Sequence, residues 1–86
     1  MAREGNRSAE AVIYENNRPF TVKIDYSGGS NPIYIAKAQA GTLVSESFWQ
    51  ILKLTWDGSN CTDVKWADGV TTFTKVYNDR ATYTYS

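Results

Sequence analysis

The sequence predicts an all-β fold: one small antiparallel sandwich or barrel of about six or seven short strands, with a flexible N-terminal arm. Three observations predict it. Aromatic and β-branched residues alternate with polar ones at a period of two, as in half-buried strands. Turn-forming pairs such as Asp57-Gly58 and Asp68-Gly69 separate these segments. No pattern of helical period extends beyond two turns.

Length and composition limit how such a domain is stabilised. The 86 residues suffice for one domain, and a β domain of this size has marginal stability by itself. The single cysteine excludes an internal disulfide, and the lack of histidine leaves no plausible zinc site. We therefore expect no metal and no cofactor, and we expect stabilisation by oligomerisation or by docking on a larger assembly.

The charges and the N-terminus argue against several classes of protein. Nine basic residues balance nine acidic ones, with no basic run of the kind that nucleic-acid binding needs. No apolar stretch approaches the roughly 20 residues that span a bilayer. The first ten residues, MAREGNRSAE, are not followed by the apolar core of a secretory signal. We expect neither nucleic acid nor membrane as a partner, and location in the cytoplasm or in a particle assembled there.

The first half of the chain divides into an arm and three strands. Residues 1–9 are small, charged and polar, which predicts a flexible arm preceding a single β domain over 10–86. The strand at 20–26 alternates best, with Phe20, Val22, Ile24 and Tyr26 on one face. The segment 43–47 is either a short helical turn or a loop. The strands predicted along the whole chain span residues 11–15, 20–26, 33–38, 48–56, 61–66, 71–77 and 81–85.

The strand at 48–56 is the strongest of the set. Large apolar side chains occupy both of its faces, which predicts a central strand covered on both sides or at an interface. The Asp57-Gly58 pair then predicts a tight hairpin turn to the strand at 61–66, because such turns require positive φ values.

The titratable residues do not form the pattern of an enzyme. Cys61 has no histidine to activate it, and we expect it to be a small buried apolar residue. Asp57 and Asp68 lie beside glycines, where aspartate is favoured for local backbone hydrogen bonds. The sequence therefore predicts a protein without catalytic residues.

The aromatic residues are the more serious candidates for a binding site. Three tryptophans are too many for so small a domain to bury completely, so they divide between the core, a protein contact and a platform for sugar rings. The candidate core or docking aromatics are Trp49, Trp56, Trp66, Tyr77, Tyr83 and Tyr85. Asp79 and Arg80 form a second candidate, an ion pair that stabilises their turn; Arg80 has Asp68 or a partner's carboxylate as alternatives.

The order and spacing of several short motifs carry a resemblance to a known class of protein. The motifs are Trp49-Gln50-Ile51, Leu54-Thr55-Trp56-Asp57-Gly58, Val64-Lys65-Trp66-Ala67-Asp68-Gly69, Phe73, Tyr77-Asn78-Asp79-Arg80 and Tyr83-Thr84-Tyr85-Ser86. Over roughly residues 31–86 the chain resembles small proteins encoded among the structural genes of tailed bacteriophages. It departs from them at Tyr77-Asn78, where others of this kind carry Trp or a second Asp.

The resemblance implies a structural component of the phage virion, assembled in the host cytoplasm. Two places in the particle stay open: capsid decoration or cement, and the neck or tail. The implied partners are other virion proteins, such as capsid or tail subunits, in a homo-oligomer or symmetric array. The alternative is a module of the tail or fibre apparatus that binds a carbohydrate or host receptor.

Overall fold

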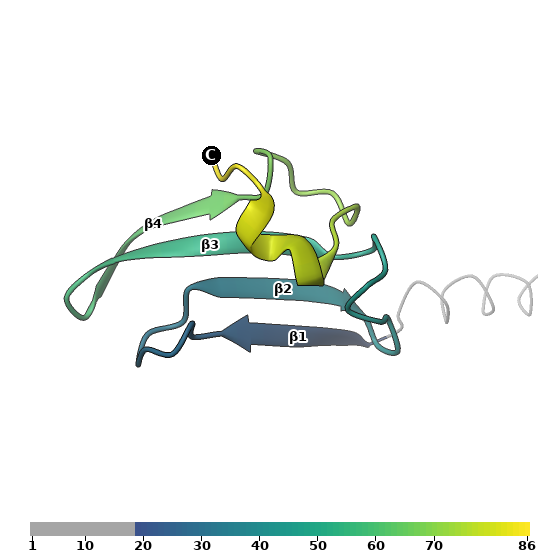
Figure 1. Cartoon of the computed structure of the whole chain (residues 1–86), viewed down its shortest axis with the longest axis horizontal. Helices are drawn as coiled ribbons and strands as arrows, with labels where there is room; N and C mark the ends of the chain where they lie inside the picture. Colours follow the sequence, from purple (N-terminus) through teal and green to yellow (C-terminus); the bar gives the residue numbers. More distant parts are fainter. Residues whose placement is uncertain (1–18) are drawn as a thin grey trace, which may run out of the picture.

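The computed structural model describes residues 19–86, so the predicted arm at 1–9 and the predicted strand at 11–15 lie outside the described residues. The described chain forms one antiparallel sheet, in which four strands follow one another in the order β1-β2-β3-β4 (Figure 1). The strands are β1 (Phe20–Asp25), β2 (Tyr34–Gln39), β3 (Gln50–Asp57) and β4 (Asn60–Trp66). The predicted all-β class and these four strands are confirmed, and β3 is an inner strand as expected.

Two tight turns follow the glycine chemistry of the sequence. Gly58, with φ of 62°, begins the two-residue turn between β3 and β4, where a type II′ hairpin turn prefers glycine. After β4, Asp68 and Gly69 both have positive φ, 53° and 69°. The amide of Val70 donates to the carbonyl of Ala67 at 3.2 Å and closes this second turn.

The predictions for the last third of the chain are wrong in secondary structure. Residues 71–77 and 81–85 form no regular strands; each contributes one isolated bridge, Lys75 with Trp49 and Tyr85 with Ala67. Between these bridges lies a short 3-10 helix, η1 (Tyr77–Thr82). The Thr/Tyr alternation at 81–85 instead places Tyr83 and Tyr85 against the face of the sheet, and Tyr77 packs on the same core.

The sheet consequently has one covered face. Residues 75–86, which contain η1 and which we call the strap, cross this face over β2 and β3 (Figure 1). Small side chains let it approach closely, because Ala36 and Ala38 of β2 and Ala67 are fully buried beneath it. Trp49 and Ile51 complete the buried core. Within residues 19–86 the architecture is a single open sheet of four strands with the strap on one side, so neither the six or seven predicted strands nor a sandwich or closed barrel is found there.

The C-terminus pairs with one end of the outer edge of β4. At the end of β4, Trp66 exchanges both backbone hydrogen bonds with Ser86, each at 3.1 Å, so the last residues of the strap pair with this edge. Further along the β3–β4 hairpin the register shifts between Thr55 and Trp56, as in a β-bulge.

Candidate docking surface

The face of the sheet opposite the strap is apolar, and the part of the chain that the structure describes does not cover it. The strand register defines which side chains share it, because paired residues point to the same side. We call this surface the open face. Its strand residues are Phe20, Val22 and Ile24 of β1, Ile35, Lys37 and Gln39 of β2, Gln50, Leu52, Leu54 and Trp56 of β3, and Cys61, Val64 and Trp66 of β4.

Several of these side chains are about half exposed. Phe20, Val22 and Ile24 expose 49%, 52% and 50% of their surface, and Val64 exposes 51%. Tyr26, which continues β1, exposes 44%. Burial would stabilise the protein by about 25 cal/mol for each Å² of apolar area removed from water. An isolated chain lacks this stabilisation over the exposed part of the open face.

The exposed apolar area is large for a chain of this size. A fully exposed aromatic side chain presents about 150–250 Å² to water and the aliphatic side chains of Val22, Ile24 and Val64 present less, so the five half-exposed residues leave roughly 400–500 Å² of accessible surface. The partly exposed Ile35, Leu52, Leu54, Trp56 and Trp66 raise this to roughly 600–700 Å². The largest apolar patch of a typical monomer covers about 300–600 Å², and larger patches mark interaction sites.

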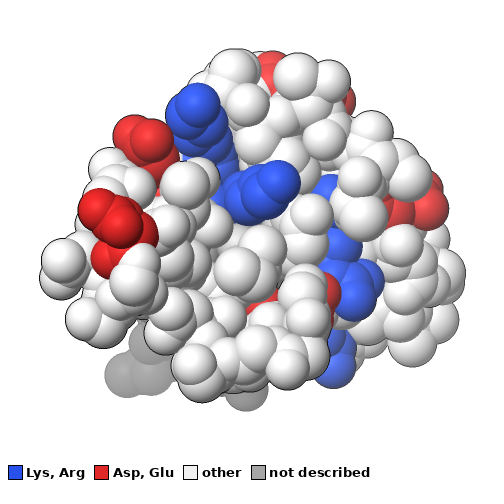
Figure 2. Space-filling model, turned by 60° about the vertical axis from the view of Figure 1, so that its left-hand side comes forward, with Lys and Arg blue, Asp and Glu red and all other residues white. Residues whose placement is uncertain are grey.

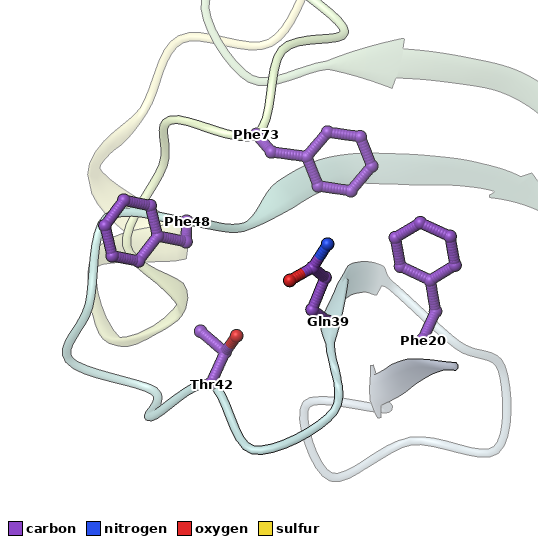
Figure 3. A pocket seen from close by; sticks show the side chains of 5 residues that line it. All are labelled: Phe20, Gln39, Thr42, Phe48 and Phe73. Atoms are coloured by element: carbon purple, nitrogen blue, oxygen red, sulfur yellow. The ribbon is translucent and has the colours of Figure 1, made fainter. Parts of the chain in front are cut away.

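Three hollows lie along the open face. The largest, of about 500 Å³, is lined by Phe20, Phe48 and Phe73 together with Gln39 and Thr42. In Figure 3 the rings of Phe20 and Phe73 lie on one side of this hollow and Phe48 on the other, with the Gln39 amide between them. Phe73 reaches this position from the loop after β4, and its ring stacks on Phe20 with centroids 5.7 Å apart.

The other two hollows have volumes of about 290 Å³ each. One lies mid-face, between Val22, Ile35, Leu52 and Trp66. The other lies at the end of the face beside the 27–32 loop, where Tyr26, Ile33 and Trp56 meet Ser30 and Asn31. The open face is therefore a row of apolar projections and depressions, the relief that interlocking surfaces require.

Charge plays a small part in this surface. Lys37 is the charged residue among the strand residues of the open face, and its ammonium lies 5.0 Å from the centre of the Phe20 ring. Figure 2 shows one side of the molecule on which blue and red side chains are interspersed among wide white areas. Neither sign of charge dominates that side, in keeping with the formal net charge of zero.

The predicted core or docking aromatics divide between the two faces. Trp49 is fully buried under the strap, and its indole nitrogen donates to the Leu43 carbonyl at 2.9 Å. Trp56 and Trp66 are partly buried on the open face. The remaining three pack on the covered side, and they are Tyr77, Tyr83 and Tyr85.

The predicted turn ion pair between Asp79 and Arg80 is wrong in its partner. The Arg80 Nε donates to Oδ2 of Asp25 at 2.8 Å, which joins η1 to the end of β1. The same guanidinium donates to the Tyr77 carbonyl and lies 4.3 Å from the Tyr77 ring centre. Because η1 lies across the sheet, Arg80 meets a carboxylate that is distant in sequence instead of its chain neighbour.

The Asp25–Arg80 contact alters the titration of both groups. The hydrogen bond from Arg80, followed by one from the Ser27 amide, lowers the pKa of Asp25 below its usual value. The hydrogen bond to Asp25 likewise raises the pKa of Arg80. Burial raises the pKa of Tyr85, whose hydroxyl donates to the Arg80 carbonyl at 2.7 Å. These groups form one clasp that holds the strap on the sheet.

A second ion pair links the turn after β4 to the strap. The Lys75 ammonium donates to Asp68 at 2.8 Å, with the Asp68 side chain 45% exposed. The hydrogen bond from Lys75 lowers the pKa of the Asp68 carboxyl. Both charged groups lie outside the open face, so this pair contributes to the fold and not to the docking surface.

The prediction for Cys61 is wrong, since its thiol lies exposed on β4 and not in the core. Within residues 19–86 there is no group of three or more Cys, Asp or Glu side chains placed to hold a metal ion. Over the same range no helix has the length and apolar character to cross a membrane.

Sequence reasoning missed the residues that contribute most to the open face. Phe20, Val22 and Ile24 were identified as one face of a half-buried strand, and Phe73 as part of a strand. Period-two alternation reveals that a strand has an apolar side, but it does not reveal whether the same chain covers that side.

Comparisons with protein-family models, with curated proteins and with solved structures find no match.

Proposed function

We propose that this protein is a non-enzymatic structural component of a phage virion, which assembles through the open face of its sheet. The observation that carries the proposal is the open face itself, roughly 600–700 Å² of exposed surface on mainly apolar residues, with three hollows. The virion setting comes from the resemblance of residues 31–86 to small phage structural proteins. Its action is passive: repeated docking stabilises an assembly by burying surface.

Assembly through this face also accounts for the marginal core. Only five residues are fully buried within the described chain, and two of them are large. A sheet with a single layer on one side gains stability when a second layer covers the other. A subunit of this kind is stabilised by its neighbours, as expected for a component repeated by symmetry.

The test is quantitative mass spectrometry of purified particles from the source of this gene, scaled to the major capsid protein. A copy number near that of the capsid protein supports a decoration or cement role on the shell. A much lower number supports the neck or tail. Absence from the particles would refute the virion role.

The open face is tested separately by incorporation of variants. Ile24→Glu places a carboxylate on the half-exposed apolar surface, whereas Lys23→Glu changes a neighbouring residue that points to the other face. We expect Ile24→Glu to be lost from particles and Lys23→Glu to be retained. Equal incorporation of both variants would mean that assembly uses another surface.

A glycan-binding module is the second candidate, and the hollow beside Trp56 favours it. This hollow combines the rings of Tyr26 and Trp56 with the polar side chains of Ser30 and Asn31, a pairing suited to the faces and hydroxyls of sugars. Tryptophan emission during titration with a glycan panel tests it, with Trp56→Phe as the control. A flat response across the panel would exclude this function.

A further inference from the structure

We propose that the open face is covered by a second copy of this chain, giving a two-fold symmetric sandwich of two four-stranded sheets. This inference rests on the proposed function, because it names the partner that covers the docking surface described there. The predicted sandwich would then exist between two subunits and not within one. The inner layer of each sheet would be the open face, and each strap would lie outside.

The available area matches what a dimer of this kind needs. A standard interface buries about 1,200–2,000 Å² in total, half of it from each partner. The open face offers roughly 600–700 Å² per copy, which reaches the lower part of that range. A short peptide or a single helix would cover only part of a surface that extends across four strands from Ile24 to Val64.

The relief of the surface is suited to self-association. In a two-fold contact the same patch serves both partners, so it must carry its own projections and depressions. Phe20, Val22 and Ile24 project from β1, while the mid-face hollow lies beside them, between β1 and Trp66 of β4. Two such sheets pack about 10 Å apart with strands crossing at about 30°, an arrangement that interdigitates these side chains.

The charges on the face favour a neutral apolar partner over a charged one. Lys37 is the charged strand residue of the face, and it leans over Phe20 toward the outer strand β1. Its aliphatic stem can pack at the interface while the ammonium reaches the rim. A charged partner would require several charges of one sign on this surface, which the strand residues of the open face do not provide.

Sedimentation of the purified full-length chain tests the proposal. We expect a dimer with a Kd of about 1 µM or lower, since interfaces of standard size have Kd values from micromolar to picomolar. Val22→Glu should weaken the dimer at least about 100-fold, because association would bury an unpaired carboxylate from each copy. Lys23→Glu, a larger change of charge at the next residue, should leave the dimer unchanged because Lys23 points to the other face.

Fluorescence provides a second measurement that needs no variant. Trp49 is already buried, whereas Trp56 and Trp66 are partly exposed on the open face. On dilution through the Kd, tryptophan emission should shift to longer wavelength while the far-ultraviolet circular dichroism stays constant. Wild-type chain that sediments as a monomer at about 100 µM would overturn the proposal. A dimer that persists in a folded Val22→Glu variant would also overturn it.

These outcomes are distinct from failure of the proposed function. A monomeric chain whose Ile24→Glu variant is still lost from particles would keep the docking role and assign the face to another virion protein. A stable dimer that is absent from particles would keep the sandwich and remove the virion role. The two hypotheses are therefore judged on different samples.

Discussion

Replacing Arg80 with methionine tests whether the clasp between η1 and β1 holds the strap on the sheet. The substitution removes a hydrogen bond to Asp25 at 2.8 Å, another to the Tyr77 carbonyl at 3.1 Å, and a cation–π contact at 4.3 Å. Methionine keeps much of the aliphatic packing over the Tyr77 ring. The loss of stability is therefore a loss of polar and electrostatic contacts.

The expected loss of stability follows from how far the Arg80 and Asp25 side chains are exposed to water. The Arg80 and Asp25 side chains are 27% and 21% exposed, so the charge-assisted hydrogen bonds contribute near the low end of about 1.5–3 kcal/mol. A partly exposed cation–π contact adds about 0.5–1 kcal/mol. We expect a loss of about 2 kcal/mol, which lowers Tm by about 8–16 °C in a domain of this size.

Urea unfolding at one fixed protein concentration measures this loss, because association would otherwise change the apparent stability. A double-mutant cycle with Asp25→Asn isolates the pair, and we expect a coupling free energy of about 1 kcal/mol or more. Lys75→Met, which breaks the pair with the more exposed Asp68, is the matched control and should cost less. A loss below about 0.5 kcal/mol for Arg80→Met, or zero coupling to Asp25, would refute the role of the clasp.

The clasp also predicts a dependence on pH. The pKa of Asp25 is lowered in the folded chain, so its contribution is present above the unfolded value near 3.8 and is lost as pH falls through the folded pKa. In Arg80→Met the free energy of unfolding should fall less on acidification, because without the guanidinium the pKa of Asp25 in the folded chain lies closer to its value in the unfolded chain.

Three further predictions concern the strap, the turn beside it and the exposed thiol. Burial raises the pKa of Tyr85, so its contribution is complete below pH 10 and is lost as pH rises beyond that; Tyr85→Phe should flatten the alkaline side of a stability–pH profile, and an unchanged slope would contradict the assignment. Gly69→Ala should cost about 1–2 kcal/mol because Gly69 has φ of 69° and an added Cβ would lie 2.8 Å from the Ser86 hydroxyl. Gly69→Asn should cost less, and Gly29→Ala, at a position without positive φ, should be near neutral in thermal unfolding. Cys61 is exposed, so a thiol reagent should modify it in the native protein; protection until urea is added would contradict its position.

Local patterns predicted the sheet well and the strap poorly. The alternation in residues 20–26 and the Asp57-Gly58 turn depend on nearest neighbours, so β1 and the β3–β4 hairpin could be predicted from them. The Thr/Tyr pattern at 81–85 has the same period, yet these residues lie across a face already formed by β2 and β3. Tertiary packing decides that outcome, and a local pattern does not contain it.

The candidate site shows the same division. The tryptophans were identified as core or docking residues, but their sequence context did not separate the buried Trp49 from Trp56 and Trp66 on the open face. The alanines are the informative residues in retrospect, because Ala36 and Ala38 mark the side on which the strap lies. Likewise Arg80 was identified correctly as an ion-pairing residue, and its partner depended on how η1 crosses the sheet.

The register shift between Thr55 and Trp56 affects how the protein behaves at high concentration. A straight unpaired strand is a template on which further chains can add without limit, the first step toward amyloid-like fibres. The bulge bends the β3–β4 hairpin, and Asp63 and Lys65 place charges along β4. At the other end of β4, Ser86 pairs with Trp66, so strand addition along β4 is hindered at both ends while the broad apolar side of the sheet stays available. Association through the apolar face is therefore favoured over strand addition at the β4 edge.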